Sequence, residues 1–195
     1  MRETILKYLG YKNYSADEET DKLIDEMLIE VKELANFKYI YKKIEKIDFL
    51  NGEGYREFLD GIDEIYLVGM TLGNQIDKRI KYYSNISPSK MMVFDACSSA
   101  YLEYMSDEYE KIFGENRTFR FCPGYGKASI KDNLYIHSYL DAFKNLNITI
   151  LDSYLMVPQK SMLGIIGIGK KKKRTCDNCL DACPFKMEGK TCYKE

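Results

Sequence analysis

The sequence predicts an α+β protein with a helical N-terminal region, a mixed or antiparallel sheet flanked by helices, and a small cysteine-rich C-terminal tail. Apolar residues recur at helical spacing over residues 15–35. Two β-branched, apolar runs lie far apart, at 63–70 and 162–168. Four of the six cysteines fall in the last twenty residues. We expect three parts: a helical region at 1–60, a main domain at 61–169, and a basic, cysteine-rich segment at 170–195.

The composition is that of a globular protein. Of 195 residues, 45% are hydrophobic and 30% are charged, and the formal net charge is -1. This composition differs from that of disordered chains, and the balanced charge argues against a general nucleic-acid binder. No apolar run reaches the roughly 18 residues that cross a bilayer, and the first residues are too polar for a secretory signal. We therefore expect a cytoplasmic protein that does not enter a membrane.

The first sixty residues are expected to be mainly helical. A short helix is predicted at 3–9, ended by Gly10. Ser15, followed three residues later by Glu18, has the form of a capping box and opens a helix that runs to about residue 35. Residues 37–49 mix Tyr, Ile and Lys, and this pattern predicts no definite element.

The middle of the chain predicts a strand and two helices. The run DEIYLVGM at 63–70 reads as a buried strand, and a helix is expected after it at 71–83. Ser87 is suited to the N-cap of a second helix, with Pro88 at its first position. That helix should run to about residue 113, and the small residues in its middle, DACSSA, would let another backbone or a ligand come close.

The last part of the main domain predicts strands around one further helix. Ser129 and Asp132 would cap this helix. The expected elements are a strand at 117–122, a turn at 123–126, a helix at 130–145, and strands at 148–157 and 162–168.

The turn in this region has an unusual sequence, RTFRFCPGYGK. Proline fixes one backbone dihedral angle, and the two glycines allow conformations that other residues avoid. Such a turn exposes its own N–H and C=O groups. Taken alone, it is most simply a tight connection between a strand and a helix.

The order of motifs from this turn onward resembles the activation domain of cobalamin-dependent methionine synthase, and most of all the free-standing activation-domain-like proteins of anaerobic bacteria. The resemblance covers about residues 63–169, and the opening of the chain is also similar to the helical lead-in of those relatives. One difference is Gly126, which replaces a proline of the long-chain synthases but also occurs in the free-standing proteins. The two most specific motifs are RxxPGY (Arg120, Pro123, Gly124 and Tyr125) and SYxMxPxxS (Ser153, Tyr154, Met156, Pro158 and Ser161).

The resemblance implies a shallow binding surface for S-adenosylmethionine. Arg120 would offer its planar guanidinium to the α-carboxylate of the ligand, and the bare backbone of the turn would approach the adenine edge. The ligand also carries an ammonium and a sulfonium, which favour nearby carboxylates. Glu103 matches one acid of the family, and Glu115 falls near a second when a one-residue gap is allowed. Taken alone, each glutamate is most simply a solvated surface residue.

The function implied is the reductive reactivation of a corrinoid methyltransferase. The protein would orient the methyl group of S-adenosylmethionine over the cobalt of a cobalamin held by a partner, which would be a corrinoid-binding methyltransferase or methionine synthase. A flavodoxin or a ferredoxin is the candidate electron donor. This role needs binding residues but no nucleophile or general base. We therefore assign no catalytic residue, and we interpret His137, the single histidine, as structural.

The tail has the spacing of a metal site, with cysteines at Cys176, Cys179, Cys183 and Cys192. Four thiolates this close in sequence are suited to an iron–sulfur cluster or a structural zinc ion, and free thiols are the simpler alternative. The preceding run, KKKKR, would steer an acidic redox partner or simply be solvated. A second function stays open: a metal-binding accessory or interaction protein without methyl transfer.

Overall fold

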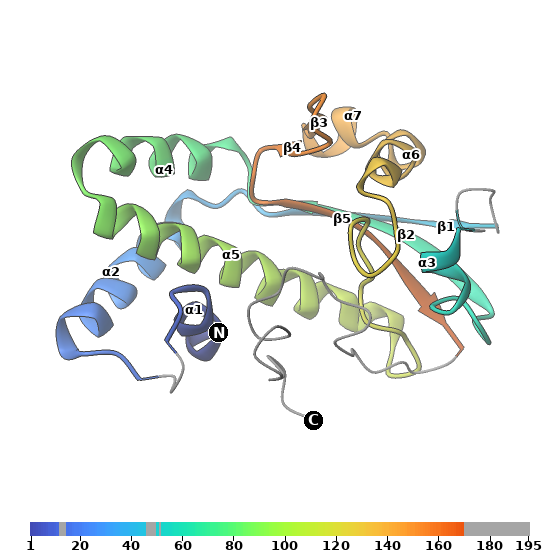
Figure 1. Cartoon of the computed structure of the whole chain (residues 1–195), viewed down its shortest axis with the longest axis horizontal. Helices are drawn as coiled ribbons and strands as arrows, with labels where there is room; N and C mark the ends of the chain where they lie inside the picture. Colours follow the sequence, from blue (N-terminus) through green and yellow to red (C-terminus); the bar gives the residue numbers. More distant parts are fainter. Residues whose placement is uncertain (12–14, 46–49, 51, 170–195) are drawn as a thin grey trace.

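The computed structural model describes residues 1–11, 15–45, 50 and 52–169 (Figure 1). The helices are α1 (Arg2–Tyr8), α2 (Glu18–Leu34), α3 (Glu53–Arg56), α4 (Asn74–Ile86), α5 (Pro88–Glu110), α6 (Asn133–Leu140) and α7 (Ala142–Leu146), with 3-10 turns at Lys111–Phe113 and Ile130–Asp132. The strands are β1 (Lys38–Ile44), β2 (Glu64–Thr71), β3 (Thr149–Ile150), β4 (Met156–Val157) and β5 (Ser161–Ile168). This arrangement confirms the α+β class.

The main sheet has three antiparallel strands in the order β1-β2-β5. Its first strand comes from the region where the sequence predicted no element. Tyr41, Lys42 and Lys43 of β1 are all exposed, so the strand lacks an alternating pattern and depends on its pairing with β2. The expected helical region 1–60 thus also supplies an edge strand to the main sheet.

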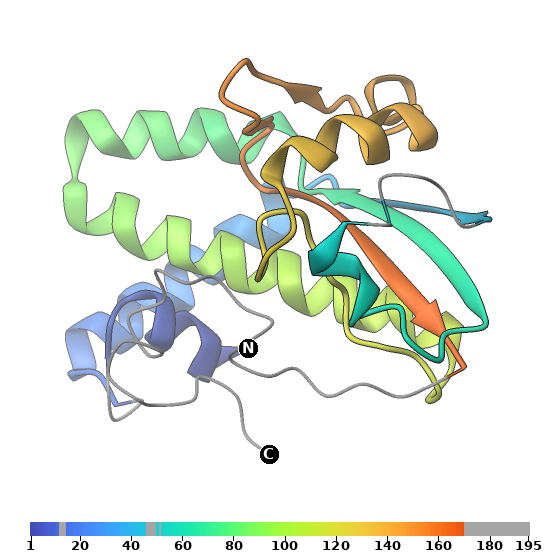
Figure 2. The ribbon, with the colours of Figure 1, turned by 45° about the vertical axis from the view of Figure 1, so that its right-hand side comes forward.

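Alternate residues of the sheet enter two separate cores. Val68 and Met70 of β2 pack with α2, α4 and α5, whereas Ile65 and Leu67 face α3, α6 and α7. Figures 1 and 2 show the long α5 on one side of the sheet and α6 with α7 on the other. The helices α6 and α7 pack closely against their face of the sheet, because a Cβ built on Gly69 would lie 2.9 Å from a methyl carbon of Leu146.

The small residues of α5 allow a close approach of α2, as the sequence predicted. Ala96, Cys97 and Ala100 are buried, and the Cys97 sulfur lies 3.8 Å from the backbone oxygen of Ile24. Burial raises the pKa of the Cys97 thiol to about 12. This cysteine is therefore a packing residue, and the small-residue cluster is filled by another helix.

The helix caps are partly as predicted. Ser87 caps α5 by accepting from the Lys90 amide at 3.4 Å. The predicted capping box at Ser15 is wrong, because α2 begins later and Asp17 caps it by accepting from the Thr20 amide at 2.9 Å. The carboxylate of Asp17 occupies the position that sequence spacing had given to the serine.

Two expected helices differ from the observed ones. The helix expected at 71–83 begins three residues later, since β2 extends to Thr71 and Gly73 turns the chain with φ at 80°. The helix expected at 130–145 is broken at Asp141, which adopts φ 49° between α6 and α7. Ser129 caps the 3-10 turn that precedes α6, but the Asp132 carboxylate instead accepts from the hydroxyl of Tyr55 at 2.8 Å.

The strand expected at 148–157 is a tight hairpin of β3 and β4. Tyr154 adopts φ 63° in its turn, and the Leu151 amide donates to the Leu155 carbonyl at 2.9 Å. The hairpin stands beside α7 in Figure 1. One ring nitrogen of His137 lies 2.7 Å from the Ile148 carbonyl oxygen, which ties α6 to the start of this hairpin and gives the histidine a structural role. Among the described residues, no helix is long and apolar enough to span a membrane.

Candidate functional site

The segment that carries Arg120 runs along the outer edge of β5. It was expected to be a regular strand, but it makes two isolated antiparallel bridges, Arg117–Ile168 and Phe121–Ile165. The Phe121 amide donates to the Ile165 carbonyl at 2.9 Å, and the reciprocal bond measures 2.8 Å. Between the bridges the ladder is irregular, because the hydroxyl of Thr118 accepts from the Gly167 amide at 3.0 Å. The segment is thus an irregular fourth member of the sheet.

Arg120 lies in a buried ion pair. Its side chain is 6% exposed and contacts the carboxylate of Glu110, which is 4% exposed, at the end of α5. Asp107, one turn earlier on α5, lies 3.8 Å from the other terminal nitrogen and is 69% exposed. Gly164 of β5 makes room for the arginine, since a Cβ there would lie 2.9 Å from Arg120 Cγ. We call Arg120, Glu110 and Asp107 the Arg120 centre.

Charge and burial act against each other in this centre. Burial alone would lower the pKa of Arg120, but the charges of Glu110, Cys122 and Asp107 outweigh it and raise the pKa. Burial raises the pKa of the Glu110 carboxyl, and Arg120 opposes that shift. Burial, and then the charge of Glu110, also raises the pKa of Tyr39, whose buried hydroxyl has no hydrogen-bond partner among the described residues. Arg120 therefore stays cationic, with one end of its fork directed to the surface acid Asp107.

The PGYG turn is held firmly on one side and is partly open on the other. Gly124 adopts φ 91° and Gly126 φ 52°, so both glycines use backbone conformations that side chains disfavour. The Gly124 amide donates to the Ala128 carbonyl at 3.1 Å, and the Ala128 amide donates back to Tyr125 at 3.0 Å. Pro123 is buried, whereas Gly124, Tyr125 and Gly126 are half-buried. The turn therefore keeps an accessible side.

The second sequence motif divides between two places. Tyr154 lies in the turn of the β3–β4 hairpin, where the Lys131 ammonium is 5.6 Å from its ring centre. Ser161 lies instead at the start of β5, where its hydroxyl donates to Thr71 at 2.8 Å. The motif thus contributes an aromatic ring at the hairpin and a polar anchor at the end of the sheet.

The two predicted glutamates lie apart from the guanidinium contact. Glu103 is on α5 and accepts from the hydroxyl of Tyr8 in α1 at 2.7 Å, and Glu115 is exposed in the loop that follows α5. The carboxylates that reach Arg120 are Glu110 and Asp107, neither of which belongs to a predicted motif. A signal for them was present, since acids at 103, 107 and 110 recur at helical spacing along α5.

Comparison with known proteins gives a match in structure alone. No protein-family model matches the chain, and no curated protein matches it in sequence. Thirteen chains of solved structures match, among them the MetH reactivation domain in a crystal structure with AdoHcy bound. The TM-score is 0.57 at 17% identity, over 80% of this chain and 67% of that one. The chain has the fold of the MetH reactivation domain. The fold expected from the sequence motifs is therefore confirmed.

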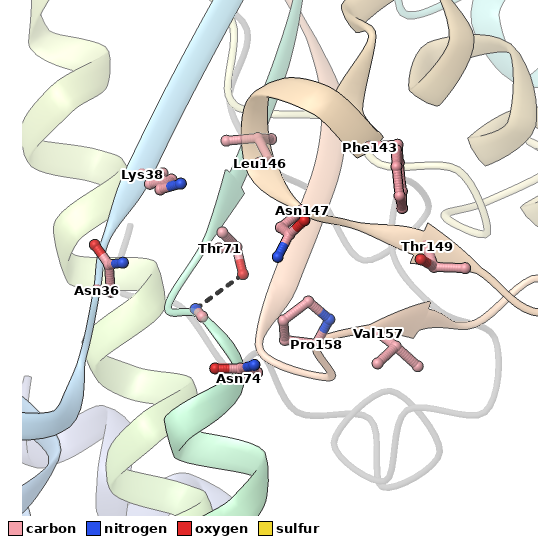
Figure 3. A pocket seen from close by; sticks show the side chains of 11 residues that line it. Asn36, Lys38, Thr71, Asn74, Phe143, Leu146, Asn147, Thr149, Val157 and Pro158 are labelled. Carbon is pink, nitrogen blue, oxygen red and sulfur yellow. Dashed lines mark hydrogen bonds between the residues drawn. The ribbon is translucent and has the colours of Figure 1, made fainter.

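The reactivation-domain fold of this chain contains a second polar feature, at one end of the main sheet. A cavity of about 300 Å³ opens where β1 begins, β2 ends, and the chain passes from β4 to β5 (Figure 3). Lys38 and Thr71 form one side, and Phe143 and Thr149 lie across from them, with Pro158 below. We call this feature the sheet-end cavity.

The predicted metal ligands Cys176, Cys179, Cys183 and Cys192 lie outside the described residues. Within the described part of the chain, no group of three or more metal-ligating side chains comes together, and neither Cys97 nor Cys122 forms a disulfide there. An iron–sulfur cluster or zinc ion in the tail thus stays a prediction.

Proposed function

We propose that this protein binds S-adenosylmethionine on the accessible side of the PGYG turn. The observation that carries the proposal is the shared fold with a domain that holds AdoHcy, the demethylated form of that nucleoside, together with the RxxPGY motif at a half-exposed turn. Backbone groups of Gly124 and Gly126 would meet the adenine edge without side-chain obstruction.

Arg120 would bind the ligand carboxylate at the end of its fork that now faces Asp107. That contact is long and its carboxylate is exposed, so Asp107 can turn away into solvent when a ligand arrives. Glu110 would stay in place and hold the guanidinium in one orientation. Glu103 and Glu115 stay the predicted acids for the ammonium group. Because the ammonium and the carboxylate share one carbon atom of the ligand, a carboxylate bound at Arg120 and an ammonium bound at Glu103, two turns before Glu110 on α5, are alternative poses.

The proposed reaction is the reductive methylation of a corrinoid held by a partner methyltransferase or methionine synthase. One electron from a flavodoxin or ferredoxin reduces cobalt(II) to cobalt(I), and the methyl group of S-adenosylmethionine then passes to cobalt and leaves AdoHcy. This chain contributes orientation of the methyl donor and no proton transfer. An iron–sulfur cluster in the tail would pass this electron on within the complex. An iron-free, colourless protein after anaerobic purification would remove the cluster from the proposal.

Calorimetric titration of the full chain with S-adenosylmethionine tests the binding. Gly124→Ala should weaken binding at least about tenfold, because a side chain at φ 91° forces the turn to shift. Gly10→Ala is a matched control, since Gly10 has φ 83° and open space around it. The control should lose similar stability and keep its affinity. Absence of binding by the unmodified protein, or equal weakening in both variants, would contradict the proposal.

A further inference from the structure

We infer that the sheet-end cavity binds a small organic anion with an apolar body, at a site separate from the Arg120 centre and independent of the proposed methyl transfer. The cavity volume of about 300 Å³ is at the lower end of the range for ligand pockets. Its lining combines an apolar wall with a few polar groups, which is the usual composition of such pockets.

The charges around the cavity favour an anion. Lys38 is the only charged side chain among the described residues that line it. The thirteen-residue helix α4 begins at Asn74 on the cavity wall, and the amides of its first turn have no intrahelical partners. Asp77, the acid nearest the start of α4, does not line the cavity, and one of its oxygens accepts from the Gln159 amide at 2.9 Å. A carboxylate or phosphate group would thus meet a cation and a helix N-terminus together.

The opposite wall is apolar and partly uncovered. The side chain of Phe143 is 60% exposed and that of Val157 is 40% exposed, whereas Pro158 is buried below them. Figure 3 shows Phe143 across the opening from Lys38. An aromatic ring or short hydrocarbon resting on this wall would cover apolar surface while its anionic group reaches Lys38.

The backbone around the cavity is fixed before any ligand arrives. The Asn36 amide donates to the Leu72 carbonyl at 2.9 Å, and the Leu72 amide donates to the Lys160 carbonyl at 2.9 Å. The buried hydroxyl of Thr71 accepts from the Gly73 amide at 3.0 Å. Three chain segments are thus joined at the floor, so binding orders few groups and its entropic cost is small.

Phenyl phosphate is the probe for this site, with benzoate as the carboxylate form, benzyl alcohol as the uncharged form and inorganic phosphate as the anion alone. Each is titrated into the full chain labelled with nitrogen-15, and the amide resonances of Asn74 and Thr149 are followed. We expect saturable shifts with phenyl phosphate or benzoate in the millimolar range or below, and none with benzyl alcohol. Inorganic phosphate should bind more weakly than phenyl phosphate.

Three variants separate a built site from general surface attraction. Lys38→Gln should weaken the binding of phenyl phosphate about tenfold, as expected for loss of a charge-assisted contact. Lys42→Gln, on the same face of β1 but outside the cavity, should leave the affinity within about twofold. Phe143→Ala should weaken the binding of phenyl phosphate and leave the affinity for inorganic phosphate unchanged. Because these three side chains are exposed, the variants should fold normally.

The inference is overturned if neither aromatic anion gives saturable shifts, or if Lys38→Gln and Lys42→Gln behave alike. A parallel titration with S-adenosylmethionine keeps this test apart from the proposed function. Shifts at Gly124 and Tyr125 with that nucleoside test the PGYG surface alone. Shifts at Asn74 and Thr149 instead would assign the cavity to the nucleoside and would also overturn the inference.

Discussion

The side chain of Arg120 is 6% exposed and touches a carboxylate that is 4% exposed, whereas Lys38, the cation of the sheet-end cavity, lies exposed beside open space. The positive charge of Arg120 is balanced by acidic side chains of the same protein. That of Lys38 stands at the rim of a cavity with no acid among its described lining residues. A motif in the sequence marked the buried centre, whereas Pro158 of the second motif lines the cavity without having indicated it. Residue types in the sequence can therefore indicate a buried, fixed charge. A cavity depends instead on how segments far apart in the sequence come together in the fold.

The largest effect on stability is expected for Glu110→Gln. It leaves the guanidinium of Arg120 buried without its counterion, so the free energy of unfolding should fall by about 3–5 kcal/mol in urea titration. Asp107→Asn, which changes an exposed and more distant partner, should cost less than about 1 kcal/mol.

A double variant keeps this test decisive. Arg120→Met combined with Glu110→Leu removes both charges and should regain most of the stability lost by Glu110→Gln alone. A loss below about 1 kcal/mol for Glu110→Gln would mean that the pair is solvated, and the contrast with the cavity would disappear.

The next effect is expected for Gly164→Ala. Its new Cβ would lie 2.9 Å from Arg120 Cγ and 3.1 Å from the Phe121 carbonyl oxygen, so overpacking should cost about 2–3 kcal/mol. The variant should also weaken the binding of S-adenosylmethionine about tenfold, because it displaces the Arg120 guanidinium.

Gly167→Ala is the matched control on the same strand. Its Cβ would meet the side chain of Ile62 at 2.8 Å on the other face of the sheet. Stability should fall in both variants, and affinity only in Gly164→Ala. Equal affinities would show that Arg120 does not reach the ligand.

The sequence predicted elements that depend on local signals and missed those that depend on pairing. The start of α5 at Ser87 and Pro88 was predicted because the cap and proline act within one turn. β1 was missed because its conformation is imposed by β2, and the break at Asp141 was missed because no proline or glycine marks it.

The same distinction holds for the candidate site. The PGYG turn was found from its own residues, and its two positive φ angles are properties of those glycines. Glu110 as the partner of Arg120 was not found, because the contact requires knowing which face of α5 lies over the edge of β5. Pro158 of the second motif lies in the cavity wall, but the motif alone could not reveal the cavity, since its other walls come from segments near residues 38, 71 and 147.

A smaller loss is expected for Thr71→Val at the floor of the cavity. The Thr71 hydroxyl is buried and accepts from both the Gly73 amide and the Ser161 hydroxyl, so its removal leaves two donors unpaired. The expected cost is about 1–2 kcal/mol in thermal or urea unfolding. Thr71→Ser keeps the acceptor and should recover most of that loss. If the two variants are equally unstable, packing of the methyl group and not the hydrogen bonds fixes the floor.

The smallest effect on stability is expected for Lys38→Gln, within about 0.5 kcal/mol of the unmodified protein, because the side chain is exposed. Glu110→Gln and Lys38→Gln each remove one charge from a polar centre on the same sheet. The first should change the unfolding free energy by several kcal/mol, and the second should change the affinity for phenyl phosphate and almost nothing else. A Lys38→Gln loss as large as that of Glu110→Gln would show that Lys38 supports the fold, and a cation needed for folding is not available to a ligand.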